Sequence, residues 1–189
     1  MIQRPELLAS THIPKPLHGL NPRTLLGKTW WDAKRQEVYA STGFTCACCG
    51  VAKAKARKHQ WLEAHEVIKV NYATGICEIE EIVPLCHYCH MFIHSGFLYS
   101  TMGSRAGHSK AEIKKILKHG FKLLNAFGLG VFPTTLEMAK EFEVDTYPCR
   151  AYSMPKSKLP WKAYTLLFQG KTYKSKFKNA NEWRKYYSK

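Results

Sequence analysis

Acidic residues are scarce in this sequence, and long apolar runs are missing from it. Only 14 Asp and Glu residues stand against 29 Lys and Arg in a chain of 189, which gives a formal net charge of +15. A protein this basic usually binds a polyanion, and we expect nucleic acid rather than a membrane surface as the partner. No apolar run approaches the roughly 18 to 20 residues that a membrane-spanning helix needs, so we expect no membrane partner.

The N-terminus also lacks the apolar core of a secretory signal peptide, and the chain shows no internal repeat. We therefore expect a cytoplasmic, reducing setting, in which clustered cysteines indicate metal binding more often than disulfides. With 45% hydrophobic residues, the chain can bury the core of one or two domains.

Turn and helix signals divide the chain into four consecutive segments. Prolines and the "HGLNPR" turn predict an extended N-terminal arm over residues 1–28. Residues 29–100 contain a leading helix and then the block that is rich in cysteine and histidine. Residues 101–147 have the pattern of a helical extension. Residues 148–189 alternate, turn at Gln169-Gly170 and end in a helical pattern, which predicts a C-terminal β-hairpin plus helix.

Two C-x2-C pairs are the strongest local motif. They are Cys46 with Cys49 and Cys86 with Cys89, and four thiolates complete the tetrahedral coordination of a structural zinc ion (Zn²⁺). Cys48 could substitute for either member of the first pair, although the spacing favours Cys46 and Cys49. We expect the first pair on a tight turn and the second on the first turn of a helix that follows an apolar strand. That is the treble-clef arrangement.

If the cysteines satisfy one zinc, His90 and His94 are left for another ion, because residues four apart share a helix face. His65 on the preceding strand is the third candidate, although the strand's phase does not say which face meets the helix. Such an open site suits metal-assisted hydrolysis with Mg²⁺, Mn²⁺, Ni²⁺ or Zn²⁺. Alternatively, the pair could be a solvated face, or His90 could replace Cys89 at the zinc. His87 is expected to point away from the His90–His94 face, toward the surface or a phosphate.

The stretch from Cys46 to Gly96 resembles the HNH nucleases of the ββα-metal superfamily, including phage-type members. The matching pieces are "CACCG", "LEAHE", "EEIVPLCHYCH" and the following His94. The resemblance implies an α+β fold: a zinc-stabilised treble-clef ββα-metal core with flanking helices, beside the C-terminal hairpin and helix. It also implies an enzyme that hydrolyses phosphodiester bonds of nucleic acid, with double-stranded DNA as the expected substrate.

Catalytic roles carry over from the family unevenly. The family places a metal ligand and then a base histidine on its first strand, and these positions hold His65 and Glu66 here. Glu66, His65 and His90 are thus the catalytic candidates, while His65, His90 and His94 would hold the cation. The family's central Asn falls on two glutamates that precede the second cysteine pair. Glu66 could act as the base, the alignment could slip so that His65 is the base, or catalysis could be lost.

Three lysine-rich stretches are expected to contact phosphates without reading bases. The candidates are Lys53, Lys55, Arg57, Lys58, Lys110, Lys114, Lys118, Lys174 and Lys176. The C-terminal module could instead bind a protein partner. The predicted function is a metal-dependent HNH-like endonuclease. The alternative is a non-catalytic, zinc-containing nucleic-acid-binding or adaptor protein on the same scaffold, and a pure protein-interaction zinc module is a third class that the net charge disfavours.

Overall fold

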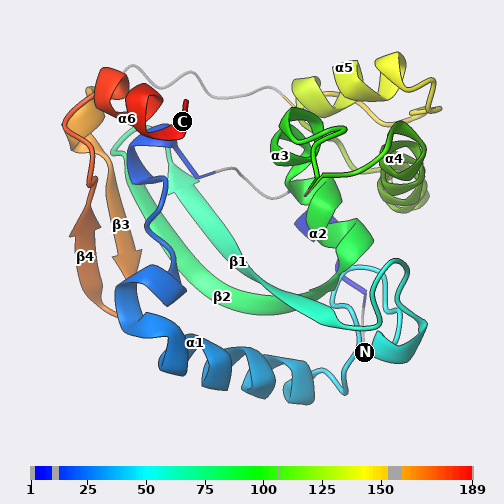
Figure 1. The fold of residues 1–189 in the computed structure, drawn as a ribbon, viewed down its shortest axis with the longest axis horizontal. Helices are drawn as coiled ribbons and strands as arrows, with labels where there is room; N and C mark the ends of the chain where they lie inside the picture. Colours follow the sequence, from blue (N-terminus) through cyan, green and yellow to red (C-terminus); the bar gives the residue numbers. More distant parts are fainter. Residues whose placement is uncertain (1–2, 10–12, 106, 153–158, 189) are drawn as a thin grey trace. The chain divides into compact units, whose positions relative to one another are not determined.

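The computed structural model describes residues 3–9, 13–105, 107–152 and 159–188, and their fold is mixed α+β, as expected (Figure 1). The α-helices are α1 (Pro22–Ser41), α2 (His87–Ile93), α3 (Ser95–Ser100), α4 (Lys110–Ala126), α5 (Pro133–Glu141) and α6 (Ala180–Tyr187). One sheet contains, in this order, β1 (Leu62–Asn71), β2 (Ile76–Cys86), β3 (Thr165–Phe168) and β4 (Lys171–Lys174). Short 3₁₀ helices cover Pro5–Ala9, Lys15–Leu17, Lys53–Lys55 and Trp161–Ala163.

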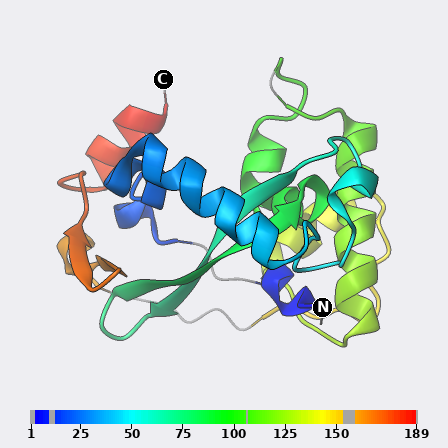
Figure 2. The same ribbon diagram turned by 90° about the horizontal axis from the view of Figure 1, so that it is seen from below.

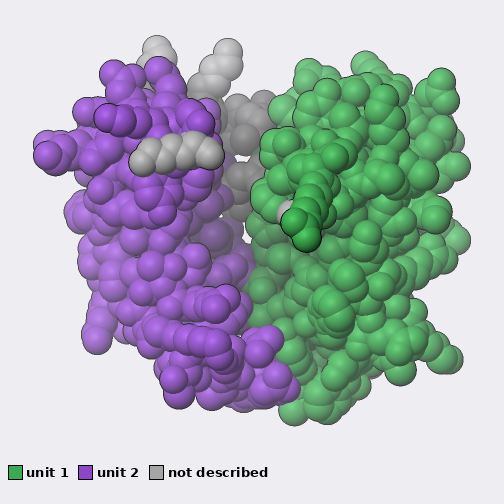
Figure 3. Space-filling view, viewed as in Figure 1, with its two compact units in different colours: residues 1–10, 38–65, 83–154 green, residues 11–37, 66–82, 155–189 purple. Residues whose placement is uncertain are grey.

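The chain forms two compact units, and each combines stretches that are far apart in the sequence (Figure 3). The first unit takes residues 1–10, 38–65 and 83–154, and the second takes residues 11–37, 66–82 and 155–189. We expected four consecutive segments instead. The difference arises because β1 and β2 each run through both units, so that no single cut in the sequence separates them.

β1 and β2 form a long hairpin (Figure 2), whose open end carries the candidate site. At the turn, Asn71 Oδ1 accepts a hydrogen bond from the Ala73 N–H (3.0 Å), and Gly75 supplies a φ of 76°. Because the chain reverses direction here, the start of β1 lies beside the end of β2. In the first unit, residues 62–65 therefore accompany residues 83–86.

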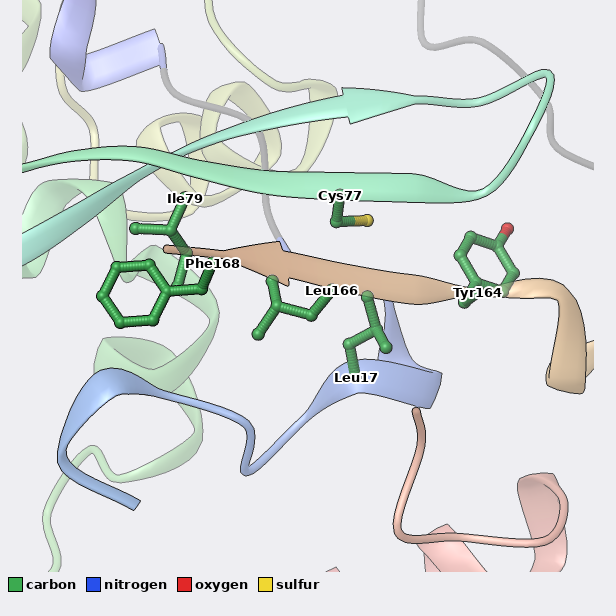
Figure 4. Close-up of a cluster of buried hydrophobic side chains, with 6 residues drawn as sticks. All are labelled: Leu17, Cys77, Ile79, Tyr164, Leu166 and Phe168. Carbon is green, nitrogen blue, oxygen red and sulfur yellow. The ribbon is translucent and has the colours of Figure 1, made fainter. Parts of the chain in front are cut away.

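The second unit has its own apolar core on β2 and β3 (Figure 4). Its fully or nearly buried side chains are Leu17, Cys77, Ile79, Tyr164, Leu166 and Phe168. β3 pairs in parallel with β2 and antiparallel with β4. The β3–β4 turn uses positive φ values at Gln169 (50°) and Gly170 (70°), and Asn179 caps α6. The predicted C-terminal β-hairpin plus helix is confirmed.

The N-terminal stretch (1–28) is not extended as we predicted, although its residues 1–2 and 10–12 lie outside the described residues. Two 3₁₀ helices occupy part of it, and α1 already begins at Pro22, although a kink at Gly27 (φ 86°) interrupts this helix. Asn21 Oδ1 accepts a hydrogen bond from the backbone N–H three residues on (2.9 Å), while proline suits the first helical position. We interpreted "NPR" as a turn, whereas these residues start a helix.

The helices of the first unit pack through α2 and α4. α4 begins at its cap Ser109, whose Oγ accepts from the Glu112 N–H (3.2 Å). Its buried face consists of Ile113, Ile116, Leu117, Phe121 and Leu124. The Phe121 ring meets Phe92 of α2 edge to face, with 5.3 Å between centroids. Across the described residues, no helix combines the length and apolarity needed to cross a bilayer.

Gly120 of α4 allows this close approach, which leads to a stability prediction. A Cβ at position 120 would overlap the buried Phe92 ring. We expect Gly120→Ala to lower the free energy of unfolding by about 1–3 kcal/mol, the usual cost of overpacking a core. Chemical denaturation would measure it. Gly96→Ala is the matched control, since nothing lies within 4 Å of its added Cβ; an equal loss in both variants would contradict the packing role.

Candidate metal centres

The first cysteine pair lies in a tight loop that backbone hydrogen bonds hold closed. An antiparallel bridge joins Thr45 to Ala52, and the Cys46 N–H donates to the Val51 carbonyl (2.9 Å). The Gly50 N–H returns to the Cys46 carbonyl (2.8 Å), with a φ of 72° that favours glycine. These bonds fix the backbone on both sides of the C-x2-C motif.

The second pair meets the first where β2 continues into α2. Cys86 ends β2, and Cys89 lies in the first turn of α2. The Ala47 N–H donates to the Pro84 carbonyl (2.8 Å), which ties the loop to the strand. As a result, the sulfur atoms of the four predicted cysteines all lie within 4.8 Å of one another.

The spacing of these sulfurs fits a zinc ion. Cys49 Sγ lies 3.7 Å from Cys86 Sγ, and a tetrahedron with Zn–S bonds of about 2.3 Å has edges of about 3.8 Å. Hydrogen bonds from Cys46, and then from Cys86 and Cys89, lower the pKa of Cys49 and so favour a thiolate there. Cys48, the alternative that the sequence left open, is buried but does not belong to the group. The four cysteines could therefore hold a metal ion, and their chemistry is compatible with structural zinc.

His119 contacts this cluster, and sequence reasoning missed it. Its Nε2 lies 3.4 Å from Cys89 Sγ, within hydrogen-bond distance. Outer contacts of this kind orient metal ligands and tune their basicity. His119 lies on α4, 30 positions from Cys89, and no motif links the two in the sequence.

Three histidines form the second group, as the helical spacing predicts. His65 lies on β1, His90 on α2, and His94 is the residue that ends α2. One ring nitrogen of each lies within 4.8 Å of the others, and the ring centroids are 4.7–5.2 Å apart. This resolves the phase that the sequence left open, because His65 faces α2. The group could hold one cation with three imidazole nitrogens.

Glu63 supports this group from the same face of β1. Its two carboxylate oxygens accept hydrogen bonds from His87 Nδ1 (2.8 Å) and from His90 Nδ1. Burial alone would raise the pKa of Glu63, but these bonds outweigh it and hold the pKa well below its ordinary value. A proton on His90 Nδ1 leaves Nε2 bare, which is the form that binds a metal. No motif pointed to Glu63 in the sequence; its position two residues before His65 was the available signal.

Glu63→Gln is expected to weaken cation binding at the three histidines by about 10- to 100-fold, the usual effect of losing such a partner. Calorimetric titration with Mn²⁺ or Ni²⁺ measures it, and the exposed Glu137→Gln is the control. Because the folded pKa of Glu63 is lowered, its contribution to stability is present above the unfolded pKa of about 4.3 and disappears as the pH falls below it. Unchanged cation affinity in Glu63→Gln would contradict the orienting role.

His87 is buried, so its expected place at the surface is wrong. It is only 6% exposed, and its Nε2 lies 2.8 Å from Nε2 of His108, another buried histidine. The reason is helical geometry: positions 87 and 90 are three apart and therefore neighbours on one face of α2. Both consequently reach Glu63.

Glu66, the predicted base, does not belong to the group of three histidines. It follows His65 directly on β1 and is half-buried, and it is assigned to the second unit. Neighbouring residues of a strand point to opposite faces. Its catalytic role remains a prediction.

The predicted phosphate contacts are mostly exposed. Lys53, Lys55, Arg57 and Lys58 lie in the loop before β1, and Lys110 and Lys118 are exposed on α4. Lys114 is partly engaged by Glu143 (3.4 Å). In the second unit, Lys174 ends β4, and Lys176 lies 4.3 Å from the centroid of the Tyr186 ring.

Comparison with known proteins adds no assignment: no protein-family model, curated protein or solved structure matches this chain, and the side-chain geometry alone carries its interpretation.

Proposed function

We propose that the protein is a metal-dependent, HNH-like endonuclease that hydrolyses phosphodiester bonds, with double-stranded DNA as its substrate. The convergence of His65, His90 and His94 from β1 and α2, beside a separate four-cysteine cluster, carries the proposal. A strand hairpin followed by a helix that begins with two of the cysteines supports a treble-clef ββα-metal core.

The histidines would hold one divalent cation, Mg²⁺, Mn²⁺, Ni²⁺ or Zn²⁺, and leave positions for water and a phosphate oxygen. Such a cation stabilises the charge that develops on the phosphorane and on the leaving oxygen. Glu63 keeps His90 in the tautomer that presents Nε2. We assign Glu66 the role of general base that accepts the proton of the attacking water. A free glutamate carboxylate is intrinsically a weaker base than an imidazole.

The charge distribution supports a nucleic-acid substrate. The chain carries +15 formal charges, and its exposed cations gather in the loop before β1, on α4 and around β4. Contacts of this kind bind phosphates and lose affinity steeply with salt. Free thiols in both cysteine pairs suit a cytoplasmic setting. The C-terminal hairpin and helix could also bind a protein partner.

A non-catalytic nucleic-acid-binding or adaptor protein is the second candidate, and one observation favours it. Glu66 stands where the resembled family has its base histidine, and Glu80-Glu81 stands where that family has its central Asn. In that case the chain would bind one zinc ion, at the four cysteines, and no cation would support cleavage.

Nicking of supercoiled plasmid, with each of the four cations added separately, tests the proposal. Loss of cleavage in both His90→Ala and Glu66→Ala would support the nuclease and the role of Glu66. Loss in His90→Ala alone would keep the nuclease and reject Glu66 as the base. An intact plasmid under every cation, with salt-sensitive binding retained, would favour the non-catalytic candidate.

A further inference from the structure

Trp61 presents an aromatic face to solvent just before β1. Its side chain is 50% exposed although indole is among the most apolar groups. The ring of His59 lies parallel to it, with 3.9 Å between centroids and 4° between planes. His59 covers one face of the indole, and half of the Trp61 surface stays accessible to solvent. The pair is a flat, two-layer stack that is partly exposed.

This stack is held in place from the metal-binding side. The His59 ring meets the His87 ring edge to face at 4.9 Å. His87 donates to Glu63, and the other oxygen of Glu63 accepts from His90 of the histidine group. Partial burial, together with the neighbouring His87, lowers the pKa of His59, which favours a neutral ring. The stack is thus connected to the proposed cation site through two side chains, His87 and Glu63.

The surroundings of the stack select an anionic partner. The segment from Gly50 to Gln60 contains Lys53, Lys55, Arg57 and Lys58 and no acidic residue. All four cations are exposed. An exposed aromatic side chain that directly follows such a basic segment matches a nucleobase attached to its phosphate backbone.

We propose that Trp61, backed by His59, stacks on an unpaired base of the strand held at the histidine group. This inference rests on the proposed function and narrows its substrate to DNA that carries an unstacked base. Inside a regular duplex, both faces of every base are covered by neighbours, so only an unpaired or extruded base can lie on Trp61. His65 follows Trp61 by four positions, so their Cα atoms are at most about 14 Å apart. This distance corresponds to about four nucleotides of one strand at 3.4 Å each. The stacked base and the phosphate that is cleaved would therefore lie within about four nucleotides of each other.

Fluorescence anisotropy with labelled oligonucleotides tests the inference, using protein that carries one zinc ion per chain, with gel electrophoresis to check that the labelled strands stay intact. The probes are a perfect duplex and the same duplex with a single-base bulge. Trp61→Ala is expected to weaken binding to the bulged duplex by about 5- to 150-fold, the range for losing one base stack. Affinity for the perfect duplex, which phosphate contacts dominate, should change by less than about twofold.

Two further variants keep the result interpretable. Trp61→Phe retains a flat ring and should bind the bulged duplex nearly as well as the wild type. Phe127→Ala removes another exposed aromatic of the first unit (52% exposed) and should change neither affinity. An equal loss on both probes, or no loss on either, would overturn the inference even if plasmid nicking establishes the nuclease. A selective loss on the bulged duplex would support it even if no cation allows cleavage.

Discussion

Cys89→Ser is expected to release the structural metal and to unfold the first unit. Cys89 is fully buried and joins α2 to the loop that contains Cys46 and Cys49. Binding of a structural zinc ion contributes an apparent free energy of about 10–16 kcal/mol. The whole free energy of unfolding of a typical domain is of similar size, about 5–15 kcal/mol. Serine is a poor ligand for this ion, so little of the contribution would survive.

Metal analysis of the purified variant, together with its thermal unfolding, measures this effect. Cys48→Ala is a closely matched control, because Cys48 is equally buried in the same loop but lies outside the group. We expect this control to keep the metal and to lose only the modest stability of a truncated core side chain. A Cys89→Ser protein that keeps both its metal and its unfolding temperature would contradict the assignment.

His94→Ala is expected to abolish the second cation site while leaving the fold and the zinc in place. His94 ends α2 and is only half-buried, so its removal leaves no large cavity. The remaining pair, His65 and His90, is a poor site for a divalent ion. Loss of a residue that hydrogen-bonds to a metal ligand usually lowers activity by about 10- to 100-fold. Because His94→Ala removes a ligand itself, the cleavage rate should fall by more than that.

Plasmid nicking rates and a cation titration check this prediction together. His18→Ala is the control, because His18 belongs to the second unit and contacts Trp183 there. It should cleave at the wild-type rate and bind both metals. Wild-type cleavage by His94→Ala at every cation concentration would exclude the histidine group as the catalytic site.

Short-range patterns in the sequence predict well which cysteines and histidines lie together. The C-x2-C pairs and the His90–His94 spacing are set by one turn of chain, so local geometry brings those side chains together. To place His65, one must also know which face of β1 packs toward α2. In the structure His65 lies on that face, close to His90 and His94. Turn residues such as Gln169-Gly170 likewise act over a few positions.

The partners of those ligands were not predictable, because long-range packing places them. His119 and His108 reach α2 from 30 and 21 positions away, and neither stands in a motif. The two-unit organisation has the same origin, since Leu17 packs in one core with Cys77 and Leu166. The prediction of an extended N-terminal arm was wrong for a different reason. The residues "NPR" are compatible with both a turn and a capped helix start, and tertiary contacts decide between the two.

The number of divalent ions bound per chain is the measurement that tests the two-centre account most directly. Native mass spectrometry would count them in the wild type and in a variant with His65, His90 and His94 all replaced by alanine. The account predicts two ions in the wild type and one, held by the cysteines, in the variant. A single ion in both proteins, or the loss of every ion from the variant, would contradict it.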